Sequence, residues 1–252
     1  GEEVTEYNGF VEFAQSTNTI AVYGKISQLY CQGNSLTNLD ITKNTALTLL
    51  DCSNNKLTDL NIVDSTRLET LLCYKNKITS LDLSKDTNLI FVSCNENMLT
   101  SIDISKNNKL TALYVSNNSL SALDVSKNTK LKTLFCYGNK LTTLDVSNNT
   151  ELTDLDVNGN MLTSLSVKNC PALAKIHCFG NQIKGKGMDA FIKSLPDRSG
   201  SNAGKIFIVN SVVHSEGNVA LVSEVKAAKD KNWEVLDFFQ HKPYDGVDDT
   251  KY

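Results

Sequence analysis

The chain has 252 residues, 25 Lys and Arg against 28 Asp and Glu, a formal net charge of −3 and a sequence pI near 5.7. These charges are spread along the chain, which excludes the basic footprint of a nucleic-acid-binding or anionic-membrane-binding protein. No apolar run approaches the roughly 20 residues of a membrane-spanning helix, and no signal-peptide pattern is present. Because the chain begins at Gly1 rather than Met, we expect a native N-terminal segment to precede it.

Residues 1–25 precede any repeat. Two alternating stretches, Val4 to Phe13 and Thr19 to Tyr23, are separated by four polar residues. Such alternation predicts a small β-hairpin. We assign residues 1–25 as an N-terminal β cap, because the end of a repeat stack exposes apolar side chains and an unpaired strand edge.

Residues 26–183 form a strict repeat of 21 residues with no insertion or deletion. Its marker is an Asn column: Asn34, Asn55, Asn76, Asn97, Asn118, Asn139, Asn160 and Asn181. Three residues before each marker lies a member of a cysteine column: Cys31, Cys52, Cys73, Cys94, Val115, Cys136, Val157 and Cys178. Eight repeats at one period predict a solenoid of stacked coils.

Within a repeat, Leu134 and Cys136 alternate with outward residues, which is the period of an extended strand. Asn139 then turns the chain, and a second apolar run ending at Val146 repeats the inward pattern. One repeat is therefore one coil with two extended sides, and stacked coils place like strands side by side in parallel sheets about 4.8 Å apart.

The Asn column is predicted to be structural, because an amide both donates and accepts where turn N–H and C=O groups lack partners. A second polar column is predicted to act similarly, less strictly, on the other side: Asn44, Ser65, Asp86, Asn107, Asn128, Asn149 and Cys170. Only its last member breaks the short-polar rule, and we expect Cys170 to be partly exposed.

The cysteine column is predicted to be buried core packing. Val115 and Val157 stand in that column, and valine can replace a buried apolar filler but not a metal ligand or a nucleophile. In-register side chains point the same way, which disfavours disulfides. We therefore expect free thiols, no metal site, no cofactor and no catalytic residue.

After Ile183 the repeat stops. Met188, Phe191, Ile192 and Leu195 recur at helical spacing, and Lys205 to Asn210 reads as a strand. A second helix is predicted over Glu216 to Lys231 with Val219, Val222, Val225 and Ala228 inward, followed by a strand over Trp233 to Phe238. Residues 184–240 thus form an α/β C-terminal cap, and residues 241–252 are expected to be an unordered tail.

Function is sought where the repeat does not dictate the residue, on the outward side of the first sheet. Three columns face outward there. The first is Gln28, Leu49, Thr70, Phe91, Ala112, Thr133, Asp154 and Lys175; the middle is Tyr30, Asp51, Leu72, Ser93, Tyr114, Phe135, Asp156 and His177; the third is Gln32, Ser53, Tyr74, Asn95, Ser116, Tyr137, Asn158 and Phe179.

Aromatic side chains on this face are the candidate binding residues, because exposed rings are enriched at binding hot spots. Tyr114, Phe135 and Tyr137 are expected to cluster beside the acidic pair Asp154 and Asp156. The full candidate set is Tyr74, Phe91, Tyr114, Phe135, Tyr137, Asp154, Asp156, His177 and Phe179. The alternative is that outward aromatics merely favour strands and cross-strand stacking.

The frame Leu-x-x-Leu-x-Cys-x-x-Asn-x-Leu-Thr-x-Leu-Asp-Val-Ser-x-Asn-Thr-x resembles the bacterial leucine-rich repeat (LRR) family, in particular its internalin-like cysteine-ladder branch. The resemblance implies a right-handed superhelix with a parallel β-sheet, an α/β protein by convention. Together with the predicted caps, this gives a β-hairpin, a solenoid and an α/β C-terminal cap in chain order.

The same resemblance implies a secreted or surface-attached bacterial protein, extracellular in location and not an enzyme, that serves in adhesion or in recognition of a host or bacterial protein ligand. Two alternatives stay open: a structural spacer of a surface protein, and a glycan-binding module. The N-terminal cap departs from the helical cap of the internalins and no wall-anchoring motif follows the repeats, so a role in invasion does not carry over.

Overall fold

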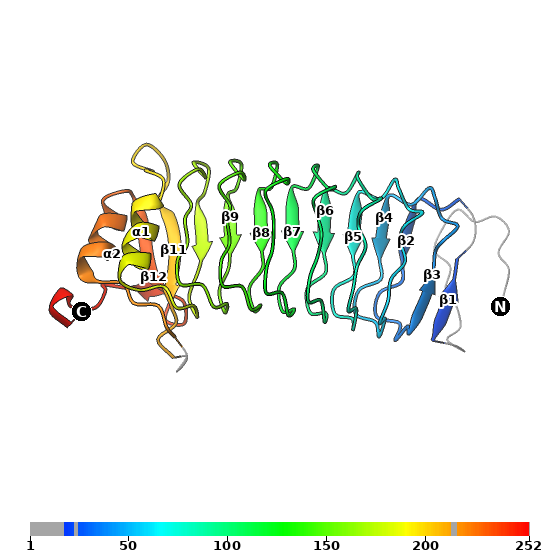
Figure 1. Ribbon diagram of the computed structural model, residues 1–252, viewed down its shortest axis with the longest axis horizontal. Helices are drawn as coiled ribbons and strands as arrows, with labels where there is room; N and C mark the ends of the chain where they lie inside the picture. Colours follow the sequence, from blue (N-terminus) through cyan, green and yellow to red (C-terminus); the bar gives the residue numbers. More distant parts are fainter. Residues whose placement is uncertain (1–17, 23–24, 213–215, 252) are drawn as a thin grey trace.

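The computed structural model describes residues 18–22, 25–212 and 216–251. The described chain is an elongated solenoid that begins at one end and carries two helices at the other (Figure 1). Successive coils stack along its length, which confirms the predicted repeat architecture.

The first side of every coil forms one continuous parallel sheet. Its repeat strands are β2 (Gln28–Tyr30), β4 (Leu49–Asp51), β5 (Thr70–Leu72), β6 (Phe91–Ser93), β7 (Ala112–Tyr114), β8 (Thr133–Phe135), β9 (Asp154–Asp156) and β10 (Lys175–His177). Each strand pairs with the next at an offset of 21 residues, as in Leu113 with Leu134. The strict period of the sequence thus sets the register of the whole sheet.

The second side of the coils is extended but lacks a continuous strand ladder, unlike the predicted pair of sheets. Among the described residues, only β1 (Thr19–Ala21) pairs with β3 (Asn38–Asp40), and Asp145 forms an isolated bridge with Ser166. Side chains instead donate hydrogen bonds to backbone carbonyls here. Asn128 Nδ2 donates to the backbone oxygens of Ile104 (3.0 Å) and Asn107 (2.9 Å).

The N-terminal hairpin falls largely outside this description, because Val4 to Phe13 belongs to residues the structure does not describe. The described run, β1, pairs in parallel with β3. It therefore stacks on the first repeat in the manner of one more coil side.

The core is a set of stacked apolar columns. Leu131, Leu134 and Cys136 are fully buried, and Val115 and Val157 are as buried as the cysteines in their column. All seven cysteines are free thiols, and burial raises the pKa of Cys31 and of Cys94 to about 12. Such thiols have almost no reactive thiolate near neutral pH.

Cys170 is also fully buried, so the expectation of partial exposure is wrong. Its Sγ donates to the Val146 carbonyl at 3.5 Å, where one coil earlier Asn149 Nδ2 donates to Val125. A thiol is a weak donor, but here it occupies the place of the amide in the second polar column.

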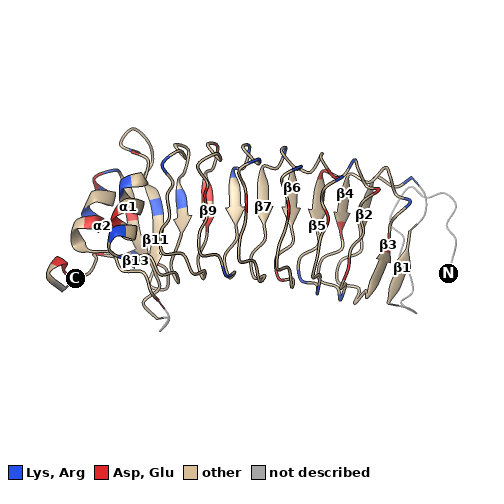
Figure 2. Cartoon of the chain, in the orientation of Figure 1, with Lys and Arg blue, Asp and Glu red and all other residues tan. Residues whose placement is uncertain are grey.

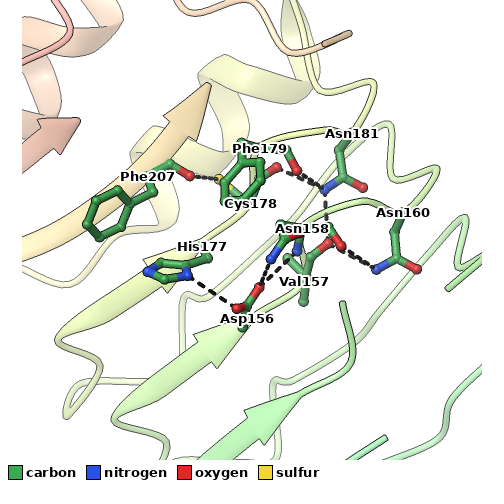
Figure 3. Close-up of polar contacts among 9 residues, drawn as sticks. All are labelled: Asp156, Val157, Asn158, Asn160, His177, Cys178, Phe179, Asn181 and Phe207. Atoms are coloured by element: carbon green, nitrogen blue, oxygen red, sulfur yellow. Dashed lines mark hydrogen bonds and ion pairs between the residues drawn. The ribbon is translucent and has the colours of Figure 1, made fainter. Parts of the chain in front are cut away.

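In the Asn column, both ends of the amide form hydrogen bonds. Asn160 Oδ1 accepts from the Leu141 N–H at 3.0 Å. Its Nδ2 donates to the carbonyls of Cys136 (3.1 Å), Val157 (3.0 Å) and Asn158 (3.2 Å), as Figure 3 shows in part. One side chain therefore ties its own turn to the preceding coil.

The C-terminal part continues the sheet and covers its end. It contains α1 (Lys186–Ser194), β11 (Gly204–Val209), α2 (Val222–Lys229) and β12 (Trp233–Asp237). β11 pairs in parallel with β10 and β12 in parallel with β11. Trp233 is buried here and its Nε1 donates to the Pro196 carbonyl at 2.9 Å.

The second helix is shorter than predicted, and Val222 is 49% exposed rather than inward. The helix starts late because the segment before it is bonded to the last coils. Asn218 Oδ1 accepts from Ile183 N–H (2.8 Å), and its Nδ2 donates to the carbonyls of Cys178 (2.7 Å) and Ile208 (2.8 Å). Asn218 thereby continues the Asn column beyond Asn181. It is missing from the sequence pattern because α1 and the longer connection after β11 displace it from the 21-residue period.

The expected unordered tail is wrong for the residues that the structure describes. β13 (Lys242–Pro243) pairs antiparallel with β12, and a short 3-10 turn, η1, spans Asp249–Lys251. Within the described ranges no helix is long and apolar enough to cross a bilayer.

Candidate binding surface

The outward face of the sheet presents its side chains in straight rows, because the strands are in register. In the middle row, Tyr114 lies beside Phe135, Phe135 beside Asp156, and Asp156 beside His177. β11 extends this row beyond the repeats by placing Phe207 beside His177.

The first aromatic cluster consists of Phe91, Tyr114 and Phe135 on β6, β7 and β8. The Phe91 ring meets that of Tyr114 edge to face, with centroids 5.1 Å apart. Tyr114 and Phe135 stack at 4.8 Å with an interplanar angle of 14°. All three are half-buried, so each keeps part of its ring open to solvent. We call these three residues the aromatic row.

Tyr137 was expected within this cluster, but the ring contacts of the described residues do not join it to the aromatic row. It is half-buried on the third outward column, where desolvation and then the charge of Asp156 raise the pKa of its hydroxyl. Tyr74, in the same column, is half-buried between Ser53 and Asn95 of the adjoining coils. Both remain candidate contact residues at the side of the row.

The acidic strand β9 separates the aromatic row from the C-terminal end, and Figure 2 shows it as an acidic stripe crossing the face. Asp156 Oδ1 accepts from Asn158 N–H at 3.2 Å, and its Oδ2 lies 3.2 Å from His177 Nδ1 (Figure 3). Asp154 accepts from the Thr153 hydroxyl at 2.8 Å. Each carboxylate is therefore already held by a neighbour.

A shallow depression of about 20 Å³ lies beside this strand. It is lined by Phe135, Asp154, Leu155, Asp156, Lys175 and His177. Such a space holds roughly one water molecule and not a substrate. Among the described residues no group of three His, Cys, Asp or Glu side chains could hold a metal ion.

A second aromatic cluster closes the C-terminal end of the face. The His177 ring lies 4.5 Å from Phe207, edge to face, and Phe179 stacks on Phe238 at 4.3 Å. Phe179 is only 9% exposed, so the cap covers this candidate residue. His177 is half-buried, and its Nε2 has no polar partner among the described residues.

Phe207 and Phe238 were not among the sequence candidates, because both lie beyond the repeats. Phe207 could have been found by extending the register: the predicted strand over Lys205 to Asn210 would have to continue the sheet, which places one of its aromatics next to His177. Phe238 follows the end of β12 and has no such signal.

Neither a protein-family model nor a curated protein matches the chain. Several solved structures match the chain in fold. The functional domain of InlJ from Listeria monocytogenes, which includes a cysteine ladder, is 35% identical, covers 63% of this chain and has a TM-score of 0.54. An LRR protein of Leptospira interrogans is 22% identical over 68% of this chain, with a TM-score of 0.64. The internalin InlF of Listeria monocytogenes is 22% identical over 84%, with a TM-score of 0.65.

The chain spans 40% of the InlJ chain, 47% of the Leptospira chain and 66% of the InlF chain. At 22% identity the last two establish the fold alone, whereas InlJ also shares the cysteine ladder named in the sequence resemblance. The chain therefore has the leucine-rich-repeat solenoid fold of internalin-type proteins, in its cysteine-ladder form.

Proposed function

We propose that this chain is the recognition module of a secreted or surface-attached bacterial protein and that it binds a protein ligand through the outward face of its sheet. The internalin-type neighbours support a protein-interaction module in general. The observation that carries the finer proposal is the aromatic row of Phe91, Tyr114 and Phe135.

The aromatic row has the properties of a binding hot spot. Its rings stand on short strands of a rigid sheet and hold one another in place by stacking, so little side-chain freedom is lost on binding. Rings that are half-buried before binding still offer apolar area to a partner. The acidic strand β9 beside them supplies a polar border of the kind that surrounds interface centres.

A binding role fits this face better than a catalytic one. Asp156 is engaged by Asn158 and His177, and the depression beside it is too small for a substrate. The thiols of the cysteine column lie on the buried side of the same sheet, and burial raises the pKa of Cys136 well above its usual range.

The test compares three proteins: the unchanged chain, a Tyr114→Ala and Phe135→Ala variant, and a control with Met98→Ala and Met161→Ala. The control removes two exposed apolar side chains, 55% and 52% exposed, that lie outside the sheet strands. Each protein is immobilised and used to capture partners from host and bacterial lysates, and captured proteins are identified by mass spectrometry.

We expect the aromatic variant to keep its circular dichroism spectrum, with partner capture reduced at least about tenfold by the loss of two hot-spot rings. The methionine control should capture as well as the unchanged chain. Equal capture by all three proteins, or no specific capture by any, would reject this face as the binding site and favour a spacer.

A further inference from the structure

Asp86 stands in the second polar column, at the turn that leads into β6, and it is the one ionisable carboxyl of that column. Its side chain is fully buried, with 0% exposure. Neither carboxyl oxygen has a hydrogen-bond partner among the described residues. A buried carboxylate without a partner is strongly disfavoured, so this position requires an explanation.

The neighbouring coils show what the position demands. Asn107 Nδ2 donates to the carbonyls of Leu83 and Asp86, both at 3.0 Å, and Asn149 donates to the corresponding carbonyls of Val125 (3.1 Å) and Asn128 (2.8 Å). The column thus supplies donors to carbonyl groups of the preceding coil. The same offsets of 24 and 21 residues assign Ile62 and Ser65 as the carbonyls for Asp86, and an ionised Asp has no donor to offer them.

We propose that Asp86 is protonated in the folded chain and serves as a donor in the place of an asparagine, so that the coil before β6 is stabilised by a proton that is released as the pH rises. A neutral carboxyl group has one O–H, which matches one of the two donor bonds of the amide. The column therefore tolerates Asp only in its acid form.

The surroundings support this state. Burial, and then the charge of Asp82 in the same coil, raise the pKa of Asp86 from 3.8 to about 7. In the coils packed before and after it, the residues at this place are Ser65 and Asn107, neither of which titrates. Lys85, the nearest cation in sequence, is exposed; the pKa of Asp82 is lowered first by hydrogen bonds from Ser84 and only then by the charge of Lys85.

The sign of the pH dependence follows from linkage. Below about pH 4 the carboxyl is neutral in both folded and unfolded chains, so it adds no pH dependence. Between about pH 4 and pH 7 folding takes up one proton, and the folding equilibrium constant falls by up to about tenfold per pH unit as pH rises. Above about pH 7 the carboxyl is ionised in both states and the dependence ends.

The experiment measures the free energy of unfolding in urea for the full chain and for Asp86→Asn, at several pH values between about pH 5 and pH 8. Comparison with this variant removes the opposite pH dependence of the exposed aspartates, such as Asp82, whose pKa is lowered by a hydrogen bond from the Ser84 backbone. Between about pH 5 and pH 8 we expect the ratio of the two folding constants to shift in favour of Asp86→Asn by about a hundredfold.

Two further measurements make the test decisive. Asn107→Asp, which places a second carboxyl in the column, should acquire the same loss of stability with rising pH. The ¹³C resonance of the Asp86 carboxyl, assigned by its absence in Asp86→Asn, should report the neutral acid at about pH 5. Parallel stability curves for the unchanged chain and Asp86→Asn, or an ionised resonance at that pH, would overturn the proposal.

Discussion

The two polar columns of the solenoid differ in how many hydrogen bonds each side chain must form. In the Asn column, Asn160 accepts one backbone bond and donates three. In the second polar column, Asn128 uses only its Nδ2, and its Oδ1 has no partner among the described residues. The first column is asparagine at all eight repeat positions, whereas the second also contains Ser65, Asp86 and Cys170.

The difference in hydrogen-bonding demand explains why one column is strictly regular and the other is not. A position that needs a hydrogen-bond acceptor and a donor on one short side chain is satisfied by the amide of asparagine. The second polar column makes a weaker demand, because its members include Cys170, whose thiol donates to the Val146 carbonyl, and Ser65, whose buried hydroxyl has no partner among the described residues. The most regular residues therefore record the hydrogen-bonding demand of the coil and carry no information about a partner.

The largest effect is expected where an Asn-column amide is removed. Asn160→Ala leaves the Leu141 N–H and several carbonyl groups buried without a partner, which should lower the free energy of unfolding by about 3–5 kcal/mol. Urea unfolding at neutral pH measures the change. A loss below about 1 kcal/mol would mean that water can replace the amide. The Asn column would then not have the stricter hydrogen-bonding demand of the two columns.

A smaller effect is expected at Asn218, which closes the same column in the cap. Asn218→Ala loses the bonds to Ile183, Cys178 and Ile208, but the end of a stack opens locally at lower cost than its middle. We expect about 2–3 kcal/mol. Hydrogen exchange should rise first at the Ile183 amide; exchange spread evenly along the solenoid would contradict a local role.

The second polar column should tolerate a shorter polar side chain. Asn128→Ser keeps a hydroxyl at the position, as Ser65 does naturally, and should cost about 1–2 kcal/mol. Asn160→Ser is the matched variant in the Asn column and should cost clearly more. Equal losses at the two sites would show that the columns differ in sequence but not in energetic demand.

The smallest effect is expected in the cysteine column. Cys136→Val reproduces the residue found at Val115 and Val157, and it should change stability by less than about 1 kcal/mol. A thiol reagent should find seven reactive cysteines in the denatured chain and none in the folded one, since all seven are buried and free. A marked loss on Cys136→Val, or fewer than seven thiols, would contradict a packing role.

The coil, the parallel sheet and its register could be predicted because a fixed period turns one local pattern into a long-range alignment. Once Leu113 and Leu134 are assigned to equivalent strands, their pairing follows, and with it the proximity of Tyr114 and Phe135. The lack of a continuous strand ladder on the second side of the described coils could not be predicted in this way, since it depends on whether backbone or side-chain donors reach the carbonyls of that side.

The start of α2 and the contacts of the C-terminal part could not be predicted, because they do not follow the 21-residue period. Valines at helical spacing suggested a helix from Glu216, yet the Glu216 carboxylate accepts from the Gly180 and Asn210 amides and holds its segment out of a helix. The candidate face was affected likewise, because Phe238 covers Phe179 from a turn that no repeat spacing could place there.

The Asn column also bears on how the number of repeats can change in evolution. Each column amide contacts only its own coil and the one before it, as Asn160 does with Leu141 and Cys136. Deletion or duplication of one whole 21-residue unit would therefore rejoin each hydrogen bond of the Asn column to an equivalent partner. The outward face would then be shortened or lengthened by one row at once, while the scaffold stays intact.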